Sequence, residues 1–130
     1  MIINSYRFAG ETGYLLDNYA GASAGYSLRA LSSSYQTTNA VVQVRRTGDS
    51  ALETFTAEEV TDGTLASWVT SGGGTENGYV RTFYDQSGNG NNLIQTINSR
   101  QPLIVSGGVL LADGLKFDGT ADYFDCGFAA

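Results

Sequence analysis

Hydrophobic and polar residues alternate in three stretches of the chain, 41–46, 79–84 and 103–111, as is typical of β-strands. In the first stretch, Val42 and Val44 fall on one face of the predicted strand and polar residues fall between them. Segments rich in glycine, asparagine and aspartate separate the stretches and favour turns. The pattern predicts a mainly β fold of antiparallel strands.

Two hairpins follow from the positions of the turns. The strand at 41–46 is followed by the turn Thr47-Gly48-Asp49-Ser50 and then by a return strand near 52–55. Gly107-Gly108 is expected to connect a strand at 103–106 to another at 109–111. Shorter strands are expected at 93–95 and, after the turn Asp113-Gly114, at 115–119.

Two segments have the spacing of helices instead. In 19–32, Ala24, Leu28 and Leu31 form an apolar stripe, and Asp17 or Asn18 provides an N-cap. The second predicted helix covers 62–70 and is capped by Thr61 or Asp62. Both helices are expected to pack on the sheet. The glycine-rich segment 71–78 between the second helix and the next strand is expected to be a flexible loop.

Three side chains near these elements have two interpretations each. Trp68, the single tryptophan, is either a core residue of its short helix or a platform for a sugar ring. Arg45 and Arg46 either form exposed pairs with Asp49 or Glu53, or bond into a buried polar network.

Composition excludes several classes of function. The net charge is −6 with one lysine among seven cationic residues, which argues against binding nucleic acid or anionic membranes. The single cysteine, Cys126, cannot form an intrachain disulfide and has no basic partner in the sequence. The absence of histidine excludes histidine-based catalytic triads and makes a zinc site untenable. No signal peptide or transmembrane run is expected.

The most distinctive stretch is 79–92, where a predicted core strand runs directly into a polar loop. The loop residues that could act through their side chains are Asp85, Gln86, Ser87, Asn89 and Asn91. Three interpretations stay open for them: a structural corner of multiple hydrogen bonds, a glycan site, or a cation site. No cofactor is otherwise expected.

An EF-hand is excluded for this loop. Asp85 to Gly90 match the first six positions of an EF-hand if Ser87 counts as an oxygen ligand. The twelfth position, however, is Thr96 instead of a bidentate glutamate, and the flanks are predicted strands. Calcium therefore stays open only as a loop of another kind.

A glycosidase would need two carboxyl groups on opposite sides of a cleft. Candidates for such a pair are Asp85, Asp113, Asp118, Asp122 and Asp125. Most of them stand beside glycine, where aspartate is commonly a turn residue. We therefore expect no catalytic residue, and the hydrolase stays a secondary alternative.

Two stretches of the sequence resemble a known enzyme family. They are residues 22–35, Ala-Ser-Ala-Gly-Tyr-Ser-Leu-Arg-Ala-Leu-Ser-Ser-Ser-Tyr, and residues 84–93, Tyr-Asp-Gln-Ser-Gly-Asn-Gly-Asn-Asn-Leu. Together with Val42-Gln43-Val44-Arg45-Arg46, they are similar to the catalytic domain of the α-L-arabinofuranosidase B family. The likeness covers about residues 20–95. It implies an antiparallel β-sandwich of the concanavalin-A-like lectin/glucanase type, which would be incomplete here. No position matches the family's catalytic carboxylates, and its disulfides are absent.

Two further stretches resemble tailed-bacteriophage structural proteins of the fibre or spike kind. They are the opening Met-Ile-Ile-Asn-Ser-Tyr-Arg-Phe and the later Lys116-Phe117-Asp118-Gly119. This resemblance implies an N-terminal arm or strand at 1–16, followed by a sandwich-like domain at 17–130 that can continue in a longer virion protein. The residues expected in an assembly arm are Ile2, Ile3, Tyr6 and Phe8.

The resemblance also implies a function. The chain is expected to be a non-enzymatic virion protein, made in the host bacterial cytoplasm, that serves in assembly or host attachment. Its expected partners are other virion proteins, further copies of itself as in a trimer, and a host glycan. The alternative is a carbohydrate-binding or glycan-active domain.

Overall fold

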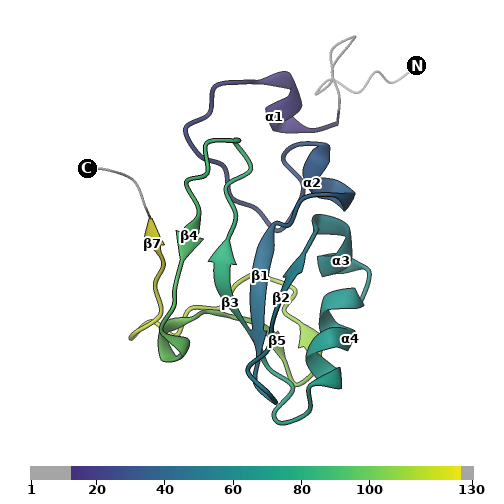
Figure 1. The fold of residues 1–130 in the computed structure, drawn as a ribbon, viewed down its shortest axis with the longest axis vertical. Helices are drawn as coiled ribbons and strands as arrows, with labels where there is room; N and C mark the ends of the chain where they lie inside the picture. Colours follow the sequence, from purple (N-terminus) through teal and green to yellow (C-terminus); the bar gives the residue numbers. More distant parts are fainter. Residues whose placement is uncertain (1–12, 127–130) are drawn as a thin grey trace.

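The structure is a computed structural model that describes residues 13–126, and its strands form one antiparallel sheet of seven strands. Figure 1 shows how this sheet curls. Its main path has the order β2-β1-β3-β4-β7, while β5 pairs with β3 and β6 with β5. The strands are β1 (Val42–Arg46), β2 (Leu52–Phe55), β3 (Gly78–Phe83), β4 (Leu93–Ile94), β5 (Leu103–Ser106), β6 (Val109–Leu110) and β7 (Asp125–Cys126). The predicted mainly antiparallel β fold is confirmed, and the curled sheet is consistent with a partial β-sandwich.

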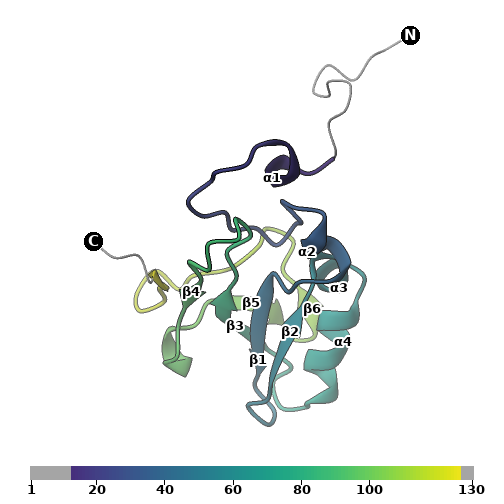
Figure 2. The same ribbon diagram turned by 45° about the horizontal axis from the view of Figure 1, so that its top comes forward.

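Four short α-helices and one 3₁₀ helix accompany the sheet in the described part of the chain. They are α1 (Leu15–Asn18), α2 (Ser34–Thr37), α3 (Ala57–Thr61), α4 (Thr64–Ser71) and η1 (Asn98–Arg100). Helices α3 and α4 lie beside β1 and β2, whereas α1 lies at one end of the molecule, beyond the sheet (Figures 1 and 2). Of these helices, none has the length and apolar character needed to cross a bilayer.

Helix α4 confirms the helix predicted at 62–70. Its N-cap is Gly63, and the Asp62 carboxylate accepts a hydrogen bond from the Thr64 N–H at 2.8 Å. The preceding α3 was not predicted, although a capping box marks its start. The Thr56 hydroxyl accepts from the Glu59 N–H at 3.3 Å, and the Glu59 carboxylate accepts from the Thr56 N–H at 2.9 Å.

The helix predicted at 19–32 is wrong. The structure has α1 before this segment and α2 after it, and most of 19–33 is irregular. Gly21 has φ +96°, which interrupts a right-handed helix. The segment's backbone groups instead bond to side chains from a loop more than 50 residues later. The glycines and serines of the segment have little helix preference, so its alanines and leucines do not impose a helix.

The two faces of the sheet differ. On one face, Val42, Val44 and Val80 are fully buried, and Leu65 and Val69 of α4 belong to the same core cluster. Burial of this apolar surface is the main stabilising contribution to the fold. The ring of Phe83, which is paired with Val42, packs on the same core, and the rings of Tyr26 and Phe124 lie against it at centroid distances of 5.9 and 6.3 Å. The other face carries Arg45 and Tyr79, which pair across β1 and β3.

The predicted hairpins are present. Val42 pairs with Phe55 across β1 and β2, and Val105 pairs with Leu110 across β5 and β6. Gly107 and Gly108 have φ values of +55° and +81°, the left-handed conformation that a two-residue hairpin turn requires. The expected boundary between an arm and a domain at residue 16 falls inside α1, and Ile2, Ile3, Tyr6 and Phe8 lie outside the described residues.

Candidate functional site

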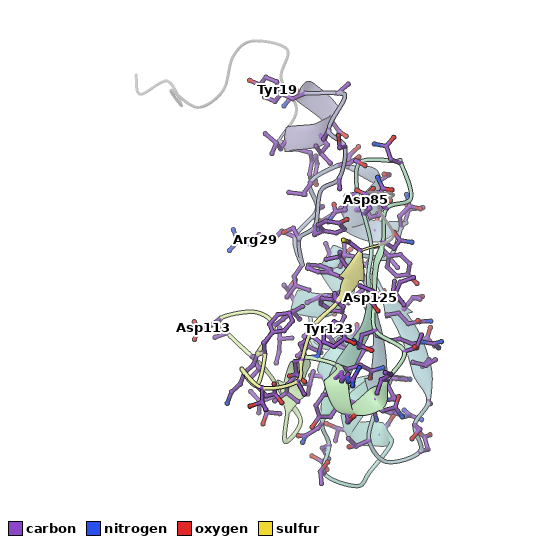
Figure 3. All side chains as sticks on the ribbon, turned by 90° about the vertical axis from the view of Figure 1, so that its left-hand side faces the viewer. Tyr19, Arg29, Asp85, Asp113, Tyr123 and Asp125 are labelled. Carbon is purple, nitrogen blue, oxygen red and sulfur yellow. The ribbon has the colours of Figure 1, made fainter. Side chains whose placement is uncertain are left out.

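The loop 85–91, singled out by the sequence, binds the irregular segment 22–31 through its side chains. Asp85 and Gln86 are each 3% exposed, so their polar groups need partners inside the protein. The loop follows β3 directly, and its backbone turns back so that these side chains face 22–31. Figure 3 shows Asp85 at the end of the molecule that carries α1.

The carboxylate of Asp85 accepts four hydrogen bonds. Oδ1 accepts from the N–H groups of Gly25 and Ser87, both at 2.8 Å. Oδ2 accepts from the Ser87 hydroxyl at 2.7 Å and from the Asn91 N–H at 3.1 Å. Burial by itself would raise the pKa of Asp85, but these donors outweigh burial and lower the pKa below its ordinary value.

The side-chain amide of Gln86 also bonds to backbone groups of the segment 22–31, through both its oxygen and its nitrogen. Its Oε1 accepts from the Leu31 N–H at 2.7 Å, while Nε2 donates to the carbonyl oxygens of Ser27 and Arg29 at 3.0 and 2.8 Å. Its backbone N–H donates to the Gly25 carbonyl at 2.7 Å. One side chain thus satisfies three backbone groups that a helix would have paired internally.

The remaining loop residues extend this contact toward residues 22 and 23. The Asn89 amide donates to the carbonyl oxygens of Ala22 and Ser23 at 2.8 and 3.1 Å, and the Asn91 amide donates to Ser23 at 2.9 Å. The Ser87 hydroxyl lies 3.4 Å from the Ser23 carbonyl. All five predicted loop residues therefore lie together, in an arrangement that fits a structural corner.

A calcium ion does not fit this loop. Calcium requires six to eight oxygen ligands that converge on one point. The Asp85 oxygens instead face N–H and O–H donors, and the Asn89 and Asn91 amides point their nitrogens toward carbonyl groups. Within residues 13–126, no group of three or more acidic or cysteine side chains is placed to hold a metal.

The candidate acid pairs are dispersed, apart from one. Figure 3 shows Asp113 on a projecting loop, far from Asp85 at the α1 end. Asp118 and Asp122 alone line a common cleft. Hydrogen bonds from the N–H groups of Ala121, Asp122 and Thr120 lower the pKa of Asp118, which opposes a general-acid role at neutral pH.

Trp68 packs as a core residue and does not form an open platform. Its ring lies 5.4 Å from the Phe55 ring, and the Arg46 guanidinium lies 4.6 Å above it. Arg46 both forms an exposed ion pair and bonds into a polar network, so both interpretations given for it from the sequence apply. It pairs with Asp49 through bonds of 2.9 and 2.7 Å, and it donates to the Trp68 carbonyl at 2.8 Å.

A cleft of about 550 Å³ lies on the other face of the sheet, away from the loop. Its floor is a row of directly opposed residues: Arg45 pairs with Tyr79, Tyr79 with Leu103, and Leu103 with Lys116. Opposed residues in antiparallel strands project from the same face, so the row runs across the sheet. The other lining residues are Thr47, Asn98, Ser99, Gln101, Asp118 and Asp122.

Arg45 is held in the cleft by a buried polar network. Its Nε donates to Oε1 of Gln101 at 2.9 Å, and its guanidinium lies 5.1 Å from the Tyr79 ring centroid. Gln101 and Gln95 are each 2% exposed, and the Gln101 amide donates to the Gln95 carbonyl at 2.8 Å. The Gln95 amide continues the chain of bonds to the Tyr123 carbonyl at 2.8 Å. Arg45 thus follows the buried-network interpretation of its sequence context.

The positive charge of the cleft has no close counterion. Among the described residues, the only ion pair within 4.0 Å joins Arg46 to Asp49, so neither Arg45 nor Lys116 has a carboxylate at that range. Burial lowers the pKa of Arg45, although arginine remains protonated at any physiological pH. The cleft therefore presents a fixed, partly desolvated guanidinium with unused donor capacity.

The sequence did not identify this cleft. The alternating pattern places Arg45 on the face of its strand that does not carry Val42 and Val44. It likewise places Tyr79 and Val80 on different faces of theirs. These two side chains become neighbours only through the register of β1 against β3, which includes a bulge between Gln43 and Val44. Lys116 enters the row through an isolated bridge that no alternating pattern marks.

Comparison of the chain with protein-family models, curated proteins and solved structures found no match.

Proposed function

We propose that this chain is a non-enzymatic structural module of a bacteriophage virion, part of a tail fibre, spike or related appendage that serves in assembly or host attachment. The proposal combines the sequence resemblance with one observation of the structure. Helix α4 packs on the core face of the single described sheet, whereas the opposite face carries a cleft and no second sheet, as in a sandwich that is incomplete.

Exposed apolar side chains support contact with other chains. Ile94, Ile97, Phe117 and Tyr123 are between 41 and 46% exposed. Ile94, Ile97 and Tyr123 come from adjoining segments, because β4 pairs with β7 and the Tyr123 N–H donates to the Arg100 carbonyl at 3.2 Å. Phe117 instead packs against the Phe124 ring at a centroid distance of 5.8 Å. Large exposed apolar side chains that gather in this way commonly mark protein contacts. Another virion protein, or further copies of this chain in a trimer, would cover them.

A non-enzymatic role is supported by the chemistry of the carboxylates. Asp85 and Asp118 both have a lowered pKa and are both tied to backbone N–H groups. Such carboxylates stabilise loops, whereas a glycosidase needs one acid that stays protonated near neutral pH.

Purified virions test this proposal. Antibodies raised against the folded chain should detect it in particles that have been separated from lysate by density gradient. Deleting residues 1–8 should abolish incorporation while circular dichroism shows that the remaining chain is folded. Absence of the chain from intact particles would refute the virion role; incorporation of the deletion variant would refute only the assembly arm.

Glycan binding is the second candidate, and the cleft is the observation that favours it. Glycan sites combine an aromatic or apolar floor with a small number of placed polar groups. The cleft offers Tyr79 and Leu103 in its floor, with amide, hydroxyl and charged groups around them. It replaces Trp68 as the place where a sugar would bind. Attachment to a host glycan would be compatible with the virion role.

A further inference from the structure

We propose that the cleft binds a carboxylate-bearing saccharide, such as a chain of uronic acids, with the ligand carboxylate on Arg45. This inference rests on the glycan-binding candidate and specifies its ligand. The row of Arg45, Tyr79, Leu103 and Lys116 forms the floor of the site.

Arg45 is suited to a carboxylate because its orientation is fixed before a ligand arrives. Nε is held by Gln101, and Nη2 lies 3.4 Å from the Asn98 carbonyl, a long contact. In the described part of the chain, Nη1 makes no hydrogen bond, and no carboxylate lies within 4.0 Å of the group. A planar guanidinium binds carboxylates through two parallel hydrogen bonds, and these are among the stronger ones in proteins.

The acidic residues of the cleft favour a sugar over a simple anion. Asp118 accepts three backbone N–H bonds through Oδ1, and Asp122 accepts the Asp118 N–H through Oδ2. Their carboxylates can accept hydrogen bonds from sugar hydroxyl groups, which a sulfate ion does not carry. A ligand that carries both a carboxylate and several hydroxyl groups can bind Arg45 through the carboxylate and Asp118 and Asp122 through the hydroxyl groups.

The dimensions of the row suit more than one sugar ring. Neighbouring strands lie about 4.8 Å apart, so three steps from Arg45 to Lys116 span about 14 Å. Lys116, the only lysine of the chain, stands at the far end of this row. A second carboxylate of an oligosaccharide could therefore reach a second cation.

Calorimetric titrations of the whole chain test the proposal with three acidic probes: trigalacturonate, a glucuronate-containing trisaccharide and sialyllactose. Each is compared with its methyl ester, which removes the charge and keeps the sugar rings. We expect at least one acid to bind, and its ester to bind about 10- to 100-fold more weakly because a charge-assisted pair is lost. Sulfate at the same concentration should not compete.

Arg45→Gln should weaken binding of the acid by a similar factor, and Arg45→Lys should have an intermediate effect because it keeps the charge and loses the fork. Arg100→Gln is the matched control, since Arg100 also lies over a tyrosine ring, at 5.5 Å from Tyr123, but does not line the cleft. Circular dichroism would verify that each variant is folded.

The outcomes separate this inference from the glycan-binding candidate. Equal affinity for an acid and its ester would overturn the carboxylate role and leave glycan binding intact. Binding that is unchanged in a folded Arg45→Gln variant would also overturn it, as would equal competition by sulfate. If none of the acids and none of the esters binds at millimolar concentration, both the inference and the glycan-binding candidate are refuted.

Discussion

Replacing Asp85 with alanine should lower the free energy of unfolding by about 3 kcal/mol. The substitution removes the acceptor of four hydrogen bonds and leaves part-buried N–H groups of Gly25, Ser87 and Asn91 without partners. An unsatisfied buried donor costs about 1–3 kcal/mol, so the sum is large for a single substitution. Chemical denaturation measures this loss, and amide hydrogen exchange should accelerate in 22–31.

Asp113→Ala is the control for this experiment, because Asp113 is exposed on the projecting loop of Figure 3. Its effect should stay within about 0.5 kcal/mol. Equal stability of the Asp85 and Asp113 variants would contradict the role of the 85–91 loop. Calcium and chelator should leave the melting temperature of the wild type unchanged; a calcium-dependent rise that Asp85→Ala abolishes would establish an ion site instead.

Acid should weaken the contribution of Asp85. Its pKa in the folded protein lies below the ordinary value of 3.8, so the ionised form is the one that folding favours. The stabilisation is therefore complete above the unfolded pKa and is lost as the pH falls through the lower, folded pKa. The difference in unfolding free energy between the wild type and Asp85→Asn should be constant near neutral pH and shrink below about pH 4. A difference that does not depend on pH would contradict this assignment.

Gly48→Ala should destabilise the protein by about 3 kcal/mol or more, for a steric reason. A Cβ at Gly48 would lie 1.7 Å from the carbonyl oxygen of Gly72 and 2.8 Å from that of Gly73. Both obstacles are backbone atoms, so the tip of the β1–β2 hairpin would have to move away from the segment that follows α4. Overpacking of this kind commonly costs 1–3 kcal/mol, and more where backbone must shift.

Gly63→Ala separates this clash from the general cost of replacing a glycine. Gly63 has φ +98°, but a Cβ there would meet nothing within 4 Å. Conformational strain alone should cost about 1 kcal/mol at that position. Denaturation curves of the two variants give the comparison. A loss at Gly48 no greater than at Gly63 would show that the hairpin tip is not held against Gly72.

The hairpin tip also shows where local reasoning was insufficient. The glycine-rich segment 71–78 was predicted to be a flexible loop, yet Thr47 makes three hydrogen bonds to its residues Thr75 and Asn77. The Thr47 N–H donates to the Asn77 carbonyl at 3.0 Å, and the hydroxyl groups of Thr47 and Thr75 lie 2.9 Å apart. Glycine at 72–74 permits this close approach of two backbones, which composition alone cannot distinguish from flexibility.

The sequence by itself determined β1 to β6, the two hairpins, α4 and the mainly antiparallel β fold. The strand predicted at 115–119 is wrong, because only an isolated bridge at Lys116 forms there, and β7 was not predicted. The features that the sequence determined depend on alternation, turn residues and short-range helical spacing, all of which act between neighbours in the chain. It also identified Asp85, Gln86, Ser87, Asn89 and Asn91 as a loop of special chemistry. It could not identify what those side chains bind.

Only the tertiary structure decided the conformation of 19–32 and the existence of the cleft. The segment has an apolar stripe with helical spacing, yet its backbone groups form hydrogen bonds with Asp85 and Gln86 instead of a helix. Partners distant in sequence can satisfy backbone groups as well as a helix can. The cleft likewise depends on strand register, which places Arg45, Tyr79 and Lys116 in one row. Register is set by the packing of the whole sheet and its bulge, so no local pattern contains it.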